Sequence, residues 1–130
     1  MYRQVTNDIE VTVVPCFQEH QSRPDAQVYV WSYDVEIVNK SAQTVKLVRR
    51  HWKITNAYGQ TLEVAGDGVV GAQPVLNPGE AFAYSSFTNL TTATGFMTGI
   101  YHMTTDGDES LDVVIPVFYL DGPALHMLPN

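Results

Sequence analysis

The chain has 130 residues and a net charge of −7, because fourteen acidic residues outnumber seven basic ones. Apolar residues make up 45% of the sequence and charged residues 16%, which excludes a disordered chain and is typical of a folded domain. The acidic balance argues against nucleic-acid binding, which depends on clustered basic side chains. Nothing approaches the ~20 consecutive apolar residues of a membrane-spanning helix, so we expect no membrane insertion.

A single cysteine, Cys16, excludes a disulfide within the chain and fits a reducing compartment. The first residues hold no apolar run of the kind that a signal peptide requires. We therefore expect a cytoplasmic protein.

Charge is unevenly distributed along the chain. All seven Lys and Arg residues lie at or before Lys53, whereas only acidic residues follow from Ile54 onward. Such asymmetry can steer a charged partner to one surface. Ordinary differences between solvent-facing strands explain it at least as well.

The secondary structure predicted from the sequence is β. Val, Thr and Ile are abundant, no segment sustains a 3.6-residue period, and Gly and Pro recur at short intervals. About seven short strands separated by turn signals are typical of a two-sheet β-sandwich. In chain order, we expect these strands over residues 9–17, 27–38, 45–55, 60–64, 81–87, 96–103 and 111–119.

The segment 27–38 shows the clearest alternation of apolar and polar residues. Its outer positions include Ser32, Asp34 and Glu36. Its inner face is predicted to carry Tyr29, Trp31, Tyr33, Val35 and Ile37.

The segment 45–55 places a tryptophan and several cations on opposite faces of one strand. With Trp52 facing the core, Arg50 also faces inward, and we expect it near a sheet edge, paired with a carboxylate. The outer face then carries Arg49, His51 and Lys53, which form either an anion-binding stripe or an ordinary solvated face.

We expect one domain over residues 1–120 and a weakly ordered C-terminal tail over residues 121–130. The dipeptide Asp106-Gly107 predicts a tight hairpin between the last two strands.

A GxGxxG string formed by Gly66, Gly68 and Gly71 follows a predicted strand. In a dinucleotide site this string opens a helix whose N-terminus faces the pyrophosphate. Pro74 and Pro78 follow almost at once, and proline in a helix interior costs ~3 kcal/mol. The sequence therefore excludes a dinucleotide-binding fold.

Two interpretations of this glycine loop remain. The glycines either supply positive φ angles to a structural turn, or they form a nest of backbone amides that binds an anion. Asp67, inside the loop, would repel a bare phosphate. A Mg²⁺ ion could bridge Asp67 to a phosphate and turn this repulsion into an attraction.

The run from Gly66 to Pro74 reads Gly-Asp-Gly-Val-Val-Gly-Ala-Gln-Pro. With its neighbouring strands, this run resembles the ApaG family over residues 9–120, and it is the most specific part of that resemblance. Phe87-Thr88-Asn89 stands where relatives often have Gly-Cys-Pro, and Ala93 replaces a proline. The other matching stretches are Arg50-His51-Trp52, Ile54-Thr55, Pro78-Gly79-Glu80 with Phe82 and Tyr84, and the alternation Gly95, Met97, Gly99, Tyr101 and Met103.

The resemblance implies an immunoglobulin-like or fibronectin-III-like sandwich. ApaG proteins are commonly associated with cobalt and magnesium efflux or resistance. Similar domains occur in eukaryotic F-box proteins and in a polymerase-delta-interacting protein, where binding roles are assumed. The resemblance supplies no catalytic residues.

Other catalytic or metal-binding patterns are weak. No two of the four histidines have a metal-ligand spacing, and Cys16 lacks an activating partner. The acidic cluster fits a hairpin turn better than a calcium loop. Its members are Asp106, Asp108, Glu109 and Asp112.

We therefore predict a non-enzymatic binding module whose ligand is a protein, or a phosphate-bearing small molecule with Mg²⁺. One alternative is an enzyme that hydrolyses phosphoanhydrides such as nucleotides, with Asp67 as metal ligand. Another alternative is a protein–protein interaction domain, which could form a homo-oligomer by pairing through an edge strand. The predicted ligand-binding residues are Arg50, His51, Gly66, Asp67, Gly68, Val69, Val70, Gly71 and Gln73.

Overall fold

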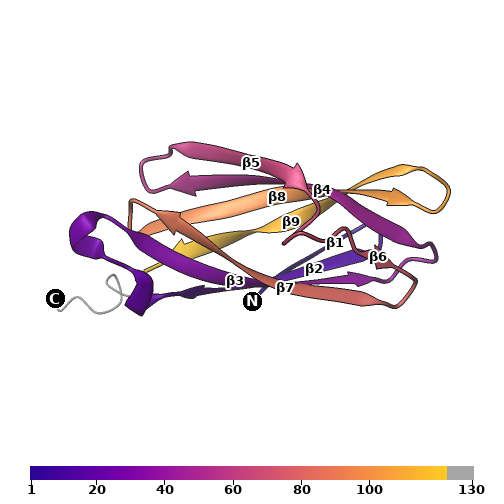
Figure 1. The fold of residues 1–130 in the computed structure, drawn as a ribbon, viewed down its shortest axis with the longest axis horizontal. Coiled ribbons are helices and arrows are strands. Elements are labelled where there is room, and N and C mark those ends of the chain that lie inside the picture. The colour runs from indigo at the N-terminus through magenta and orange to yellow at the C-terminus, as the bar shows by residue number, and fades with distance from the viewer. Residues whose placement is uncertain (123–130) are drawn as a thin grey trace.

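The computed structural model describes residues 1–122, so most of the predicted tail, residues 123–130, lies outside the described residues. Two antiparallel sheets form a β-sandwich (Figure 1), which confirms the predicted all-β fold class. Two single 3₁₀ turns lie between the second and third strands: η1 (Glu19–Gln21) and η2 (Pro24–Ala26). The strands are β1 (Tyr2–Thr6), β2 (Ile9–Phe17), β3 (Tyr29–Asn39), β4 (Val45–Asn56), β5 (Thr61–Asp67), β6 (Val75–Leu76), β7 (Ala81–Leu90), β8 (Thr94–Thr105) and β9 (Ser110–Asp121).

The first sheet has the order β1-β2-β3-β7, and the second has the order β5-β4-β8-β9, with β6 paired to β4. The core fills the space between them. Trp31 and Trp52, from opposite sheets, are 1% and 3% exposed, as the alternation of their strands predicts. The chain after Gly71 leads into β6 rather than a helix, in agreement with the two prolines that follow. In the part of the chain that the structure describes, no helix is long and apolar enough to cross a membrane.

Strands β1 and β6 were not predicted. A two-residue turn at Asn7 and Asp8, with φ angles of 49° and 63°, joins β1 to β2. Two consecutive positive φ angles are those of a type I′ hairpin turn, which Asn and Asp tolerate. The β8–β9 hairpin forms where Asp106-Gly107 predicts it. Its turn is longer than two residues, because the Thr105 amide donates to the carbonyl of Glu109.

Strand β4 contains a β-bulge at Val48. Leu47 pairs with Met103 and Arg49 with His102, so Val48 has no residue opposite it on β8. A bulge shifts the alternation of the strand by one residue. Leu47 and Trp52 are therefore both buried although they are five positions apart, an odd spacing that puts residues of a regular strand on opposite faces.

The β1–β9 side of the sandwich is closed. Strands β1 and β2 both pack against β9. The Val114 amide of β9 donates to the Thr6 hydroxyl at 3.3 Å, and the ring of Tyr2 lies 6.2 Å from that of Phe118. In the first sheet, Lys40 pairs with Glu10 of β2 at 2.7 Å, and this hydrogen bond lowers the pKa of Glu10.

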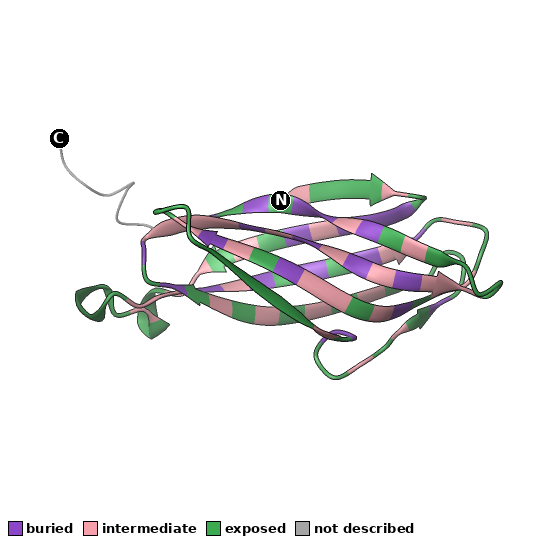
Figure 2. Cartoon of the chain, turned by 90° about the horizontal axis from the view of Figure 1, so that it is seen from above, coloured by how far each residue is buried: buried purple, intermediate pink, exposed green. Residues whose placement is uncertain are grey.

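The β5–β7 side is open. Within residues 1–122, strand β7 pairs only with β3 and β5 only with β4, so both are terminal strands of their sheets. Figure 2 shows β5 as an almost wholly exposed strand. The glycine loop follows β5 directly and lies at one end of this opening.

Candidate functional site

The tip of the glycine loop is a tight turn. The amide of Val69 donates to the carbonyl of Ala72, and the amide of Ala72 donates back to the carbonyl of Val69, both at 2.8 Å. Between them, Val70 and Gly71 have φ angles of 43° and 80°. Glycine adopts this conformation freely, whereas a β-branched residue such as Val70 rarely does.

The bulge in β4 anchors this loop. The carbonyl of Val48 accepts hydrogen bonds from the Gly68 amide at 2.8 Å and from Nε2 of Gln73 at 3.0 Å. A Cβ on Gly68 would lie 2.0 Å from the carbonyl oxygen of Ala72, so only glycine fits there. The side chain of Val69 is fully buried. These contacts support the interpretation of the loop as a structural turn.

Arg50 points toward the space between the sheets, as its position relative to Trp52 predicts. Its Nη1 donates to the carbonyls of Asp67 and Gly68, each at 2.9 Å. A Cβ on Gly66 would lie 3.0 Å from Nη1, so this glycine makes room for the guanidinium. The expected carboxylate partner was wrong: none of the ion pairs within residues 1–122 involves Arg50.

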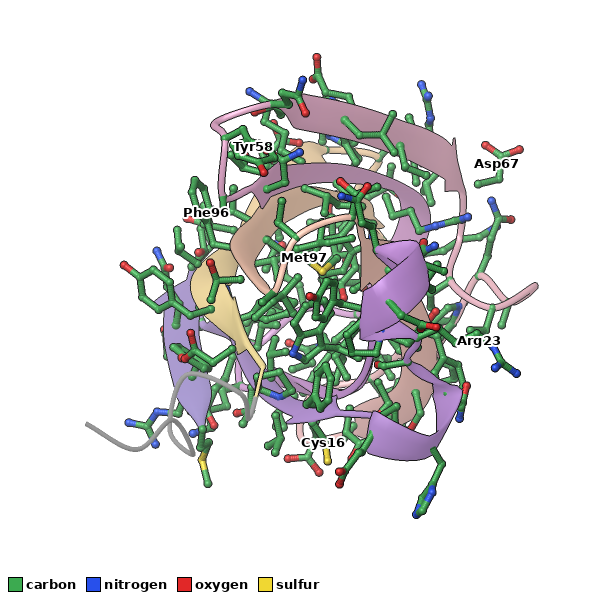
Figure 3. All side chains as sticks on the ribbon, turned by 90° about the vertical axis from the view of Figure 1, so that its left-hand side faces the viewer. Cys16, Arg23, Tyr58, Asp67, Phe96 and Met97 are labelled. Carbon is green, nitrogen blue, oxygen red and sulfur yellow. The ribbon has the colours of Figure 1, made fainter. Side chains whose placement is uncertain are left out.

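His51 and Asp67 lie on the opposite, outer face of the second sheet. Nε2 of His51 is 2.9 Å from Oε1 of Glu63, and Oδ1 of Asp67 is 4.0 Å from Nε of Arg49. The side chain of Asp67 is 84% exposed. Figure 3 shows it projecting outside the sandwich, whereas Met97 lies between the sheets. Among the predicted ligand-binding residues, the structure thus separates His51 and the Asp67 carboxylate from Arg50.

A cavity of about 220 Å³ opens between the sheets beside Arg50. It reaches from β3 and β7 on one side to β4 on the other, and the turn at Val69 and Val70 forms one end. The residues that line it are Tyr33, Arg50, Trp52, Val69, Val70, Tyr84 and Ser86.

Sequence reasoning did not include Tyr33, Tyr84 and Ser86 in the site. All three face inward by the alternation of β3 and β7, which the sequence shows. Their place beside Arg50 depends on which strands end each sheet, and no pattern in the sequence states that.

The hydroxyl groups of the cavity remain protonated at neutral pH. Burial raises the pKa of Tyr33 and, more strongly, that of Tyr84. The hydroxyl of Tyr84 lies 2.5 Å from that of Tyr101, whose pKa burial also raises. Within residues 1–122, Nε and Nη2 of Arg50 have no hydrogen-bond partner. The cavity therefore combines a cation with neutral hydroxyl donors.

The residues around the loop do not fit a magnesium site. In the described part of the chain, no group of three or more His, Cys, Asp or Glu side chains is placed to hold a metal ion. The one carboxylate of the loop, that of Asp67, has a guanidinium beside it. A hard cation such as Mg²⁺ takes several oxygen ligands.

Over residues 1–122, fold and cavity together define a β-sandwich with a cationic opening between its sheets. The ApaG domain family model matches residues 19–105, and the chain belongs to this family. This confirms the resemblance carried by the glycine loop and the strands around it.

The chain is 50% identical to Protein ApaG of Methylocella silvestris over 130 residues, which is 100% of both chains. It is 52% identical to Protein ApaG of Paramagnetospirillum magneticum over 123 residues, 95% of each. A crystal structure of a Bordetella pertussis protein assigned as ApaA superposes with a TM-score of 0.87 at 40% identity. That match covers 92% of this chain and 98% of the other.

Proposed function

We propose that the protein is a non-enzymatic binding module whose opening between the sheets receives an anionic group, a carboxylate or a phosphate, of its ligand. One observation carries the proposal: the guanidinium of Arg50 faces a cavity while Nε and Nη2 lack partners within residues 1–122. Arginine binds oxyanions through paired, charge-assisted hydrogen bonds. In this cavity Tyr33 and Ser86 can add hydroxyl donors.

The size of the cavity indicates what part of the ligand enters. Pockets for whole small molecules measure ~300–1,000 Å³. A cavity of about 220 Å³ suits one charged group, with the rest of the ligand outside. The proposal thus names a recognition site for an anionic end or side group.

The proposal assigns no metal, since the donor set at Asp67 does not fit one. The link to cobalt and magnesium that the resemblance implies would then act through the bound partner. As part of the same proposal, the module works in the cytoplasm, where its exposed Cys16 would stay reduced. Hydrolysis of any nucleotide in a panel incubated with Mg²⁺ and the pure protein would contradict the non-enzymatic assignment.

The test is a titration with phosphate and with acetate, followed by NMR signals of the Arg50 guanidinium and the Tyr33 ring. We expect shifts with dissociation constants in the millimolar range, about 4 kcal/mol of binding free energy. Replacement Arg50→Gln is expected to weaken binding about tenfold or more, because a charged hydrogen bond contributes ~1.5–3 kcal/mol. The matched control is Arg49→Gln, the neighbouring arginine on the outer face.

Arg50 also braces the loop, so a second variant separates the two roles. Tyr33→Phe removes a hydroxyl from the cavity and leaves the loop contacts in place. It should weaken anion binding about threefold to tenfold, the loss of one neutral hydrogen bond. Equal binding by the Arg50 and Arg49 variants, or no shift at either probe, would reject the site.

A further inference from the structure

The inner face of β5 is not covered by the opposite sheet. Leu62 pairs with Ile54 and Val64 with Trp52, so both share the face that the core uses. Nevertheless, Leu62 is 63% exposed and Val64 is 37% exposed, whereas Trp52 is 3% exposed. The second sheet therefore extends one strand beyond the first.

Strand β7 ends the first sheet directly beside this uncovered face. It has ten residues without a charge or a proline, and Phe87 on it is 59% exposed. Natural edge strands usually carry a lysine, a proline or a bulge that prevents pairing with another chain. The free edge of β7 has none of these, and a strand added to it would lie over β5.

A groove of about 470 Å³ already occupies this position. All its lining residues are uncharged. Groove and cavity are separate hollows that reach successive residues of β7, since Ser86 lines the cavity and Phe87 the groove. The lining residues are Ile54, Asn56, Gln60, Thr61, Leu62, Val64, Phe87, Thr88, Asn89, Leu90 and Thr91.

We infer that this side of the sandwich binds an extended segment of a partner protein, which adds a strand to β7 and delivers an Asp or Glu carboxylate to Arg50. Main-chain hydrogen bonds to a sheet edge give such complexes their affinity, and pockets for alternate side chains give specificity. Alternate apolar side chains of the segment cover Leu62 and Val64. The inference rests on the proposed anion site, because Arg50 fixes where the acidic residue of the segment lies.

The test begins with selection from a displayed library of random peptides about ten residues long, the length of β7. We expect peptides that alternate apolar residues and carry one acidic residue. This acidic residue should be absent from peptides selected on Arg50→Gln. The best peptide is then synthesised, with and without N-methyl groups on alternate amides.

N-methylation removes strand hydrogen bonds while it keeps the side chains. It should weaken binding at least about tenfold when the methylated amides face β7, because several main-chain hydrogen bonds are lost together. Methylation at the intervening positions is the matched control and should change affinity less than about threefold. Amide exchange of β7 should slow when the peptide binds.

Two substitutions on exposed apolar residues locate the surface. Leu62→Glu places a carboxylate in the groove, where it repels the acidic residue of the peptide and removes an apolar contact. It should weaken peptide binding about tenfold or more. Val117→Glu is the control, because Val117 is 48% exposed on β9 at the closed side. It should leave the affinity within about twofold.

Several outcomes would overturn the inference. These are no selected binder, a binder insensitive to N-methylation, or equal effects of the two glutamate variants. Slow amide exchange of β7 in the absence of peptide would also overturn the inference in two cases. If the slow exchange depends on protein concentration, a second copy of the chain covers β7. If it disappears when the chain is truncated after Gly122, residues 123–130 cover it. If acetate and phosphate still bind at Arg50 in those cases, the anion site stands and only the peptide is rejected.

Discussion

Along the β1–β9 side the two sheets close on each other, whereas along the β5–β7 side they part. The closed side uses aromatic contacts from Tyr2 to Phe118, and its terminal strand β9 contains Pro116. The open side leaves Leu62 exposed and has an edge strand, β7, without charge or proline. Tight packing between the sheets is thus concentrated on one side of the molecule, and core-facing side chains that no strand covers lie on the other.

The largest expected difference between the two sides comes from the same substitution, Phe→Ala, made once on each side. Phe118→Ala on β9 removes a ring that is fully buried and should lower the free energy of unfolding by ~3–5 kcal/mol. Phe87→Ala on β7 removes a ring that is 59% exposed and should cost less than ~1 kcal/mol. Urea denaturation of both variants measures the difference. Similar losses would show that the β7 side is also part of the stabilising core.

A second pair tests whether the glycine loop is a fixed end of the open side. Gly68→Ala brings a Cβ against the Ala72 carbonyl at positive φ and should destabilise the protein by at least ~2 kcal/mol. Gly71→Ala, also at positive φ but with nothing within 4 Å, should cost only ~1 kcal/mol. Thermal unfolding reports both changes. A tolerated alanine at position 68 would mean that the loop rearranges easily.

The smallest expected effect at neutral pH concerns the tyrosines beside the opening. Burial raises the pKa of Tyr33, Tyr84 and Tyr101 in the folded protein above the unfolded value near 10. A raised folded pKa means that their contribution to stability is intact below pH ~10 and is lost as the pH rises further. An ultraviolet titration should therefore show these three ionising together with unfolding. Free ionisation near pH 10 without unfolding would place them in contact with water.

Much of this architecture could be predicted from alternation alone. The positions of Trp31 and Trp52 showed which faces of β3 and β4 lie in the core, and the same alternation correctly predicted that Arg50 points inward. Two prolines after Gly71 correctly excluded a helix. These features depend on local chemistry, which the sequence displays directly.

The arrangement of the open side could not be predicted in the same way. Alternation places Leu62 inward, yet it is exposed, because exposure depends on how far one sheet extends beyond the other. Tyr84 lies beside Arg50 only because β7, the terminal strand of the first sheet, faces β4 of the second sheet across the cavity. Such relations are set by the packing of strands distant in sequence. The turn at Asn7 and Asp8, by contrast, carried a readable signal.

The extra residue at Val48 decides which of two adjacent arginines reaches the interior. Without this bulge, the alternation that buries Leu47 would also place Arg49, His51 and Lys53 on the core-facing side. Trp52 would then face the solvent. One unpaired residue thus spares the core three polar side chains. The bulge also leaves the Val48 carbonyl free to accept hydrogen bonds from Gly68 and Gln73 of the glycine loop. The inward position of Arg50 and the position of the loop beside it therefore both depend on this bulge.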